Sequence, residues 1–197
     1  MFGIETRYLS FFFGLVSILS FFNIIYSYYL NLYLNLDTYY LSFFCLLVIS
    51  ILFYNLKFEQ KKFTIFNKIL TIFIGYIFIP LVLSIPFYFS IYNLTFLNSF
   101  FEAISGFTST GFTIFDNIKH IDQSLILWRS STQWIGGLYF LFSIIFLIDI
   151  YDENFKKTLT NFISFDSSEI FKQAIKIFLL YSVLTLIIFI ILNIFSI

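Results

Sequence analysis

Residues 100–137 decide how this chain folds, and they read FFEAISGFTSTGFTIFDNIKHIDQSLILWRSSTQWIGG. The stretch holds four of the seven glycines, both tryptophans, the only histidine and a Ser/Thr run at residues 108–110. Long apolar segments lie on both sides of it. Unpaired peptide groups in hydrocarbon are costly, so polar, glycine-rich backbone between membrane-length segments needs a reason. Such backbone persists at membrane depth where it lines a water-filled path or binds an ion.

The composition is that of an integral membrane protein. Of 197 residues, 60% are hydrophobic and 11% are charged, whereas soluble domains have about 25% charged residues. The formal net charge is zero, so nothing in the charge balance predicts a nucleic-acid partner. The single cysteine, Cys45, cannot form an intrachain disulfide.

Five runs without Asp, Glu, Lys or Arg, between 19 and 33 residues long, predict membrane helices, because a spanning helix needs about 20 apolar residues. They are residues 8–36, 38–56, 69–101, 130–148 and 177–197. The first run is too long for a signal-peptide core, so we expect it to stay in the mature protein. The sequence therefore predicts an all-α integral membrane protein with about five transmembrane helices.

Lysine and arginine predict the orientation. Nine of the eleven lie before the first predicted helix, between the second and third, or after the fourth; Lys119 and Arg129 lie between the third and fourth. Because positive loops favour the cytoplasmic side, the N-terminus is expected in the cytoplasm of a multi-pass protein of the cell (inner) membrane. Residues 100–129 must then enter and leave on the external side, as a re-entrant loop or an external loop.

The pattern of this segment favours re-entry by a short pore helix. Residues 97–107 form an apolar stretch of about three helical turns, too short to span. Asn98 or Ser99 can cap its start, with Glu102 in the first turn and Gly106 at the end. A helix that stops halfway directs the negative end of its dipole at the bilayer centre, where it stabilises a cation.

The polar turn after this helix is suited to bind a cation. Chain that returns to the surface can present successive carbonyls, and a Thr or Ser hydroxyl, as the oxygen ligands that replace the hydration shell of K⁺ in channels. Gly111 suits the turn because glycine reaches backbone angles closed to other residues. The other interpretation of residues 108–112 is a polar turn in an external loop.

The sequence of this turn is similar to that of a known family. Residues 101–111, FEAISGFTSTG, closely resemble the first pore loop of the TrkH/KtrB/HKT superfamily of potassium transporters. The two leading predicted helices resemble the TrkH branch, which has an extra N-terminal pair. Three short segments resemble the part of the family's sequence that leads into the next helix. They are residues 122–124 (DQS), 128–130 (WRS) and 133–137 (QWIGG).

The resemblance implies a site, an activity and partners. It places Ser109, Thr110, Gly111 and Phe112 at the filter positions for K⁺, with Thr108 in support. K⁺ is then the transported ion, and no cofactor is expected in this chain. The resemblance also implies a homodimer in the lipid bilayer and a cytoplasmic nucleotide-binding regulatory subunit.

Other residues of the segment are expected to support the loop. Glu102 either caps the pore helix or attracts cations at its mouth. Arg129 either snorkels to the interface or pairs with Glu102 or Asp122 to brace the loop. Small residues allow close helix packing in membranes. The complete supporting set is Glu102, Gly106, Arg129, Gly136 and Gly137.

The tryptophans, the histidine and the two prolines have simpler interpretations. Trp128 and Trp134 are expected as interfacial anchors. His120 is expected to be exposed in a loop. Pro80 and Pro86 would kink the third predicted helix.

The chain departs from the family pattern in two ways. The family has four helix–pore loop–helix repeats and this chain has one pore loop, while Tyr139 replaces a small residue. We therefore expect the N-terminal part of a Trk-type potassium uptake protein. Its expected parts are an N-terminal helix pair at 1–64, the first repeat at 65–150, a cytoplasmic linker at 151–168 and the first helix of a truncated second repeat at 169–197.

Two alternatives to transport follow from the sequence. The chain could be a non-transporting membrane subunit or an inactive truncated remnant. A serine hydrolase built from Ser109, His120 and Asp122 is not expected, because the spacing is poor and there is no G-x-S-x-G elbow. One His and one Cys cannot make a zinc site either. We therefore expect no enzymatic activity.

Overall fold

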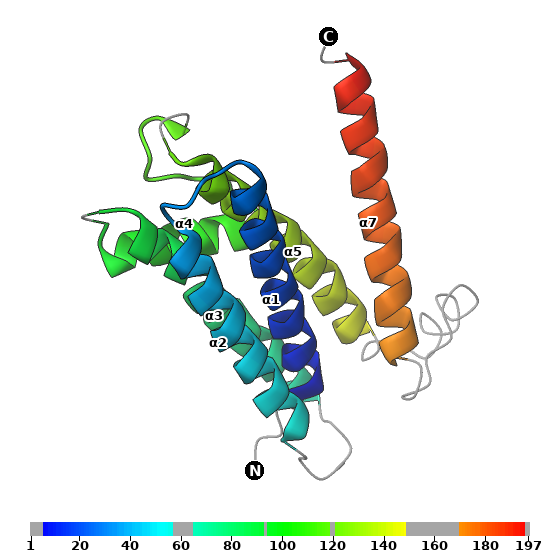
Figure 1. Ribbon diagram of the computed structural model, residues 1–197. Coiled ribbons are helices and arrows are strands. Elements are labelled where there is room, and N and C mark those ends of the chain that lie inside the picture. The colour runs from blue at the N-terminus through cyan, green and yellow to red at the C-terminus, as the bar shows by residue number, and fades with distance from the viewer. Residues whose placement is uncertain (1–5, 57–64, 93, 119–120, 149–169, 196–197) are drawn as a thin grey trace. The chain divides into compact units, whose positions relative to one another are not determined.

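The computed structural model describes residues 6–56, 65–92, 94–118, 121–148 and 170–195, and the secondary structure in these ranges is helical. The chain divides into two compact units, Met1–Phe140 and Leu141–Ile197. Figure 1 shows α4 as much shorter than the other helices. The helices are α1 (Thr6–Tyr29), α2 (Leu36–Asn55), α3 (Ile65–Ser90), α4 (Phe96–Phe107), α5 (Gln123–Ile148) and α7 (Ile170–Phe195).

Four helices among the described residues are long and apolar enough to cross a membrane. They are Thr6–Tyr29, Leu36–Asn55, Phe66–Ser90 and Ile175–Phe195. The predicted all-helical class is thus confirmed, and the uncharged run 8–36 covers all of α1 except its first two residues, together with the turn into α2. The fifth predicted span, 130–148, lies in α5 and stays a prediction. The linker at 151–168 and His120 lie outside the described residues.

Small polar residues hold α1 against α2. The Ser10 hydroxyl donates to the Ser50 carbonyl at 2.8 Å, and the Ser50 hydroxyl donates back to the Ser10 carbonyl at 2.9 Å. One turn further along α1, a Cβ on Gly14 would lie 3.2 Å from the Ser50 hydroxyl oxygen. Lipid tails are as apolar as leucine, so membrane helices associate through this kind of close approach and interhelical hydrogen bonding.

Tyr139 of α5 fills the space between α3, α4 and α1. Its side chain is fully buried, and its hydroxyl donates to the Ile72 carbonyl of α3 at 2.9 Å. Ring centroids of Phe12 and Phe107 lie 4.7 and 5.2 Å from its own. A Cβ on Gly75 of α3 would overlap the Tyr139 hydroxyl. The large residue at position 139 is therefore accommodated by the absence of a side chain at position 75.

Trp128 joins α5 to a proline-containing part of α3. The indole is fully buried, and its Nε1 donates to the Leu83 carbonyl at 3.0 Å, between Pro80 and Pro86. The prediction that Trp128 is an interfacial anchor is wrong, because both the apolar ring and the N–H donor find partners inside the protein. Trp134 is half-buried, and its role as an anchor stays a prediction.

The second unit contains α7, a helix of mostly apolar residues. None of the residues in the most apolar window of Ile175–Phe195 is buried. Such a surface is what a lipid-facing helix presents. The two compact units divide after Phe140. The division of the chain into the four parts expected from the sequence stays a prediction.

Gly75→Ala should lower the stability of the chain, because the new methyl group overlaps Tyr139. Overpacking of this kind costs about 1–3 kcal/mol. Gly14→Ala is the matched control, since its methyl group meets only the Ser50 hydroxyl and alanine favours a helix by about 1 kcal/mol. The measurement is the thermal unfolding midpoint of the full chain in detergent. Equal losses for the two variants would contradict the packing described for Tyr139.

Candidate functional site

Helix α4 begins one residue earlier than predicted and is capped by Thr95. Thr95 has an extended backbone (φ −72°, ψ 153°), and its side-chain oxygen accepts a hydrogen bond from the Asn98 amide at 3.3 Å. The predicted caps, Asn98 and Ser99, are wrong, because both residues already lie within the helix. The Ser99 hydroxyl donates instead to the Thr95 carbonyl at 3.1 Å.

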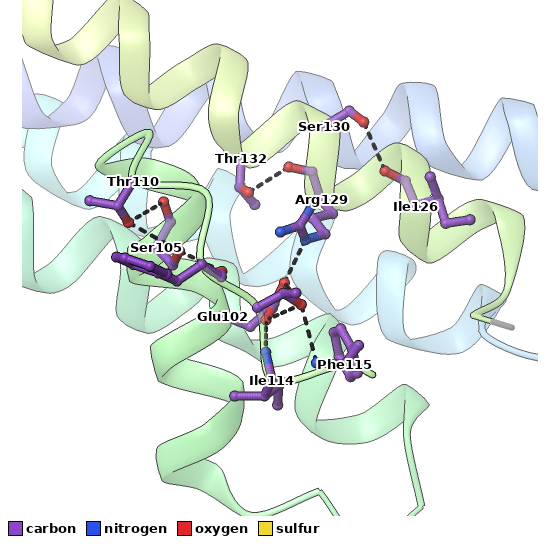
Figure 2. Close-up of polar contacts among 11 residues, drawn as sticks. Glu102, Ser105, Thr110, Ile114, Phe115, Ile126, Arg129, Ser130 and Thr132 are labelled. Atoms are coloured by element: carbon purple, nitrogen blue, oxygen red, sulfur yellow. Dashed lines mark hydrogen bonds and ion pairs between the residues drawn. The ribbon is translucent and has the colours of Figure 1, made fainter. Parts of the chain in front are cut away.

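Glu102 lies in the second turn of α4, with a fully buried carboxylate (Figure 2). The carboxylate accepts a hydrogen bond from Arg129 Nε at 2.5 Å. It also accepts from the Thr113 hydroxyl, at 3.1 Å to each oxygen, and from the Ile114 amide at 3.1 Å. The prediction of Glu102 as a first-turn cap is wrong. A buried carboxylate is stable only when paired and hydrogen-bonded, and here it ties the chain beyond the loop to α4.

Arg129 supplies the charge that this carboxylate requires. It lies in the second turn of α5, with 15% of its side chain exposed. The sequence allowed two interpretations of Arg129, snorkelling to the interface or pairing with a carboxylate. In the structure Arg129 forms an ion pair, and its partner is Glu102 rather than Asp122. The ion pair therefore fixes α5 beside α4 and, through Glu102, beside the chain that follows the loop.

Asp122 has a different role at the start of α5. Its Oδ2 accepts hydrogen bonds from Asn35 Nδ2 and from the Ser124 hydroxyl, both at 2.7 Å. The Ser124 hydroxyl in turn accepts from the Tyr39 hydroxyl at 3.0 Å. This network joins the turn between α1 and α2 to the end of the loop segment. The resemblance to the family implied an entry into the next helix at residues 122–124, but the sequence gave no sign of the partners 85 and 87 residues away.

The loop after α4 is exposed and contains two left-handed residues. Ser109 has φ 55° and Gly111 has φ 78°. A Cβ on Gly111 would meet nothing within 4 Å, so only the backbone conformation favours glycine there. Positive φ at Ser109 is uncommon for a non-glycine residue, and no feature of the sequence predicted it.

The loop directs its hydrogen-bond donors back to α4. Three successive amides and two hydroxyls bond to carbonyls in the last turn of α4, where helical carbonyls lack partners within the helix. The bonds are Thr108 N and Thr108 Oγ1 to Ile104 O (2.8 and 2.7 Å), Ser109 N to Gly106 O (3.0 Å), and Thr110 N and Thr110 Oγ1 to Ser105 O (3.1 and 3.2 Å).

Three successive carbonyl oxygens of the loop lack a hydrogen-bond donor among the described residues. Within the described parts of the chain, no group donates a hydrogen bond to the carbonyls of Ser109, Thr110 or Gly111. Residues 108–113 are exposed, including 70% of the Phe112 side chain. Carbonyl oxygens that lack a hydrogen-bond donor, on exposed residues, are suited to coordinate a cation.

Two of the predicted supporting glycines lie where helices meet. A Cβ on Gly106 would overlap the Thr132 hydroxyl, and a Cβ on Gly136 would overlap the Phe107 carbonyl. Gly106 lies within the last turn of α4, which ends at Phe107. Gly137 is half-buried on α5. Gly136 thus lets α5 pass directly against the end of α4, beside the base of the loop.

Comparisons with known proteins give matches over part of the chain. An uncharacterized cation transporter of Methanocaldococcus jannaschii is 38% identical over 55 residues, which are 28% of this chain and 12% of that protein. The Trk system potassium uptake protein TrkI of Halomonas elongata is 40% identical over 60 residues, 30% of this chain and 11% of that protein. Trk system potassium uptake protein TrkH of Escherichia coli is 38% identical over 56 residues, 28% of this chain and 12% of that protein.

The chain carries a partial match to the TrkH family. The resemblance predicted from the sequence is thereby confirmed for this part of the chain. The matched segment spans 11–12% of the length of these relatives. No family model and no solved structure matches the chain.

Arg129→Ala should destabilise the chain, because it leaves the Glu102 carboxylate buried without its counter-charge. Breaking a buried pair in this way costs about 3–5 kcal/mol. We expect the folded yield of the variant, measured by size-exclusion chromatography in detergent, to fall more than its ion selectivity changes. Normal yield with altered permeation would instead place Arg129 on the ion path.

Two further variants test whether the loss comes from the unpaired carboxylate. Ser130→Ala changes the exposed neighbour of Arg129 and should shift the free energy of unfolding by no more than about 0.5 kcal/mol. Adding Glu102→Gln to Arg129→Ala removes the orphaned charge, so the double variant should lose less stability than the sum of the single variants. Simple additivity would show that the two side chains do not depend on each other.

Proposed function

We propose that this chain takes part in the movement of K⁺, or a similar monovalent cation, across a membrane, as the N-terminal part of a Trk-type potassium uptake protein. One observation carries the proposal: in an exposed loop, the amides of residues 108–110 are bonded to α4, and the carbonyls of residues 109–111 receive no hydrogen bond from the described residues. The similarity to Trk potassium uptake proteins supports the same conclusion.

In this proposal α4 is a re-entrant pore helix and the loop is one part of a selectivity filter. Ser109, Thr110, Gly111 and Phe112 are the filter residues, and Thr108 supports them from the base of the loop. Their carbonyls replace water around the ion, and the C-terminal end of the α4 dipole favours its positive charge. A pore needs several such loops around one axis, so other chain segments or further copies complete it.

The remaining features of the proposal concern location and partners. The protein is multi-pass in the cell (inner) membrane with a cytoplasmic N-terminus, as the distribution of lysine and arginine favours. By resemblance to the family, it works as a homodimer with a cytoplasmic nucleotide-binding regulatory subunit. In this proposal the chain binds no cofactor, and K⁺ is the transported ion.

Gly111→Ser should degrade discrimination between K⁺ and Na⁺. The position has φ 78° and no neighbour around its Cβ, so the substitution strains only the backbone of the filter. Left-handed conformations cost L-residues about 1–2 kcal/mol. The matched control is Ser109→Gly, which makes a left-handed conformation easier and should retain selectivity. The measurement is the ratio of Rb⁺ to Na⁺ influx, and an unchanged ratio in Gly111→Ser would rule out the filter assignment.

Complementation tests the proposed function itself. The whole chain would be expressed alone, and fused to the reading frame that follows it in its genome, in cells that lack K⁺ uptake. Growth at low K⁺ and Rb⁺ influx are the readouts, and we expect rescue by the fusion. Rescue by the chain alone would mean that several copies assemble one pore. No rescue by either form, with both present in the membrane, would overturn the proposal.

A further inference from the structure

We propose that the Ser105 hydroxyl withholds the Phe112 carbonyl from the ion path, so that the filter segment of this chain ends at Gly111. The inference rests on the proposed function and revises it at one residue. Ser105 lies in the last turn of α4 and is 4% exposed. Its hydroxyl donates to the Phe112 carbonyl oxygen at 2.6 Å, the short end of the range for O–H···O hydrogen bonds.

The same hydroxyl sets the orientation of Thr110. A serine hydroxyl has one proton, and that of Ser105 is committed to Phe112 because a carbonyl can only accept. In the 3.1 Å contact between Ser105 Oγ and Thr110 Oγ1, the donor must therefore be Thr110. The Thr110 hydroxyl also lies 3.2 Å from the Ser105 carbonyl, its second acceptor (Figure 2). Its proton thus points towards α4.

A second anchor on the same face of α4 acts just beyond Phe112. Glu102 and Ser105 are three residues apart, a spacing that places side chains on one face of a helix. Ser105 holds the Phe112 carbonyl, and Glu102 holds the Thr113 hydroxyl and the Ile114 amide. The backbone returns to α4 at Phe112, and hydrogen bonds hold it against α4 as far as Ile114. In contrast, the carbonyls of residues 109–111 receive no hydrogen bond from the described residues.

Ser99 is the natural comparison for Ser105. It lies on the same helix and is fully buried, but the hydrogen bond of its hydroxyl goes to the Thr95 carbonyl just before α4 and not to the loop. Replacing Ser99 therefore tests the loss of a buried hydroxyl from α4. Replacing Ser105 tests, in addition, the release of the Phe112 carbonyl.

The first experiment observes the carbonyl directly. Solid-state NMR of the full chain in lipid bilayers, with ¹³C-carbonyl phenylalanine and ¹⁵N-threonine, selects the three Phe–Thr peptide bonds, at residues 63–64, 107–108 and 112–113. Loss of a signal in Thr113→Ser assigns Phe112. Ser105→Ala should shift the Phe112 carbonyl signal, Ser105→Thr should restore it, and Ser99→Ala should leave it in place. An unmoved signal in Ser105→Ala overturns the inference.

The second experiment measures selectivity in whichever form of the chain restores K⁺ uptake. Ser105→Ala should change the ratio of Rb⁺ to Na⁺ influx roughly fivefold, the factor expected from the net effect of one neutral hydrogen bond. Ser105→Thr should recover the ratio, and Ser99→Ala should leave the ratio unchanged even if it lowers folded yield. A shifted NMR signal without a change in the ratio would show that the released carbonyl does not face the ion.

The two proposals fail in different ways. A wild-type chain that transports nothing in any form overturns the proposed function, while the Phe112 signal still decides whether Ser105 holds that carbonyl. Normal wild-type transport with an unmoved signal in Ser105→Ala overturns this inference alone.

Discussion

The buried charge of Glu102 is the constraint on which the loop segment depends. A carboxylate without solvent exposure requires a counter-charge and hydrogen-bond donors, and here these come from α5 and from the chain beyond the loop. Arg129 can reach it only if α5 lies against α4. Gly136 permits that approach, because any side chain there would overlap the Phe107 carbonyl. Charge pairing and backbone packing thus require the same arrangement of the two helices.

The packing of Tyr139 against Gly75 shows how α5 and α3 accommodate a large buried side chain. A tyrosine at position 139 adds a ring and a hydroxyl to the contact between α5 and α3. The ring packs among aromatic neighbours such as Phe12, and the hydroxyl finds the Ile72 carbonyl. Because protein interiors are close-packed, space had to be released on the facing helix, and Gly75 provides it.

The parts of the fold that follow from local composition could be predicted from the sequence, and the parts that depend on distant partners could not. The all-helical class and the position of α4, within one residue, follow from apolar runs and their breaks. Trp128 was misinterpreted because an amphipathic ring suits a membrane interface as well as a buried acceptor, and that acceptor, Leu83, is 45 residues away. Arg129 allowed two interpretations for the same reason. The left-handed turn at Ser109 has no signal in residue type.

The hydrogen bond between Asn35 and Asp122 also affects how the protein is made. The two residues are 87 positions apart, so at a synthesis rate of about 5–20 residues per second the acceptor emerges roughly 4–17 s after the donor. During that interval the Asn35 side chain lacks its partner of the folded chain, whereas Ser10 and Ser50, whose hydrogen bonds join α1 to α2, are only 40 positions apart. The hydrogen bonds between α1 and α2 therefore require only chain that is synthesised before α5, and the bond to Asp122 is the one that has to wait.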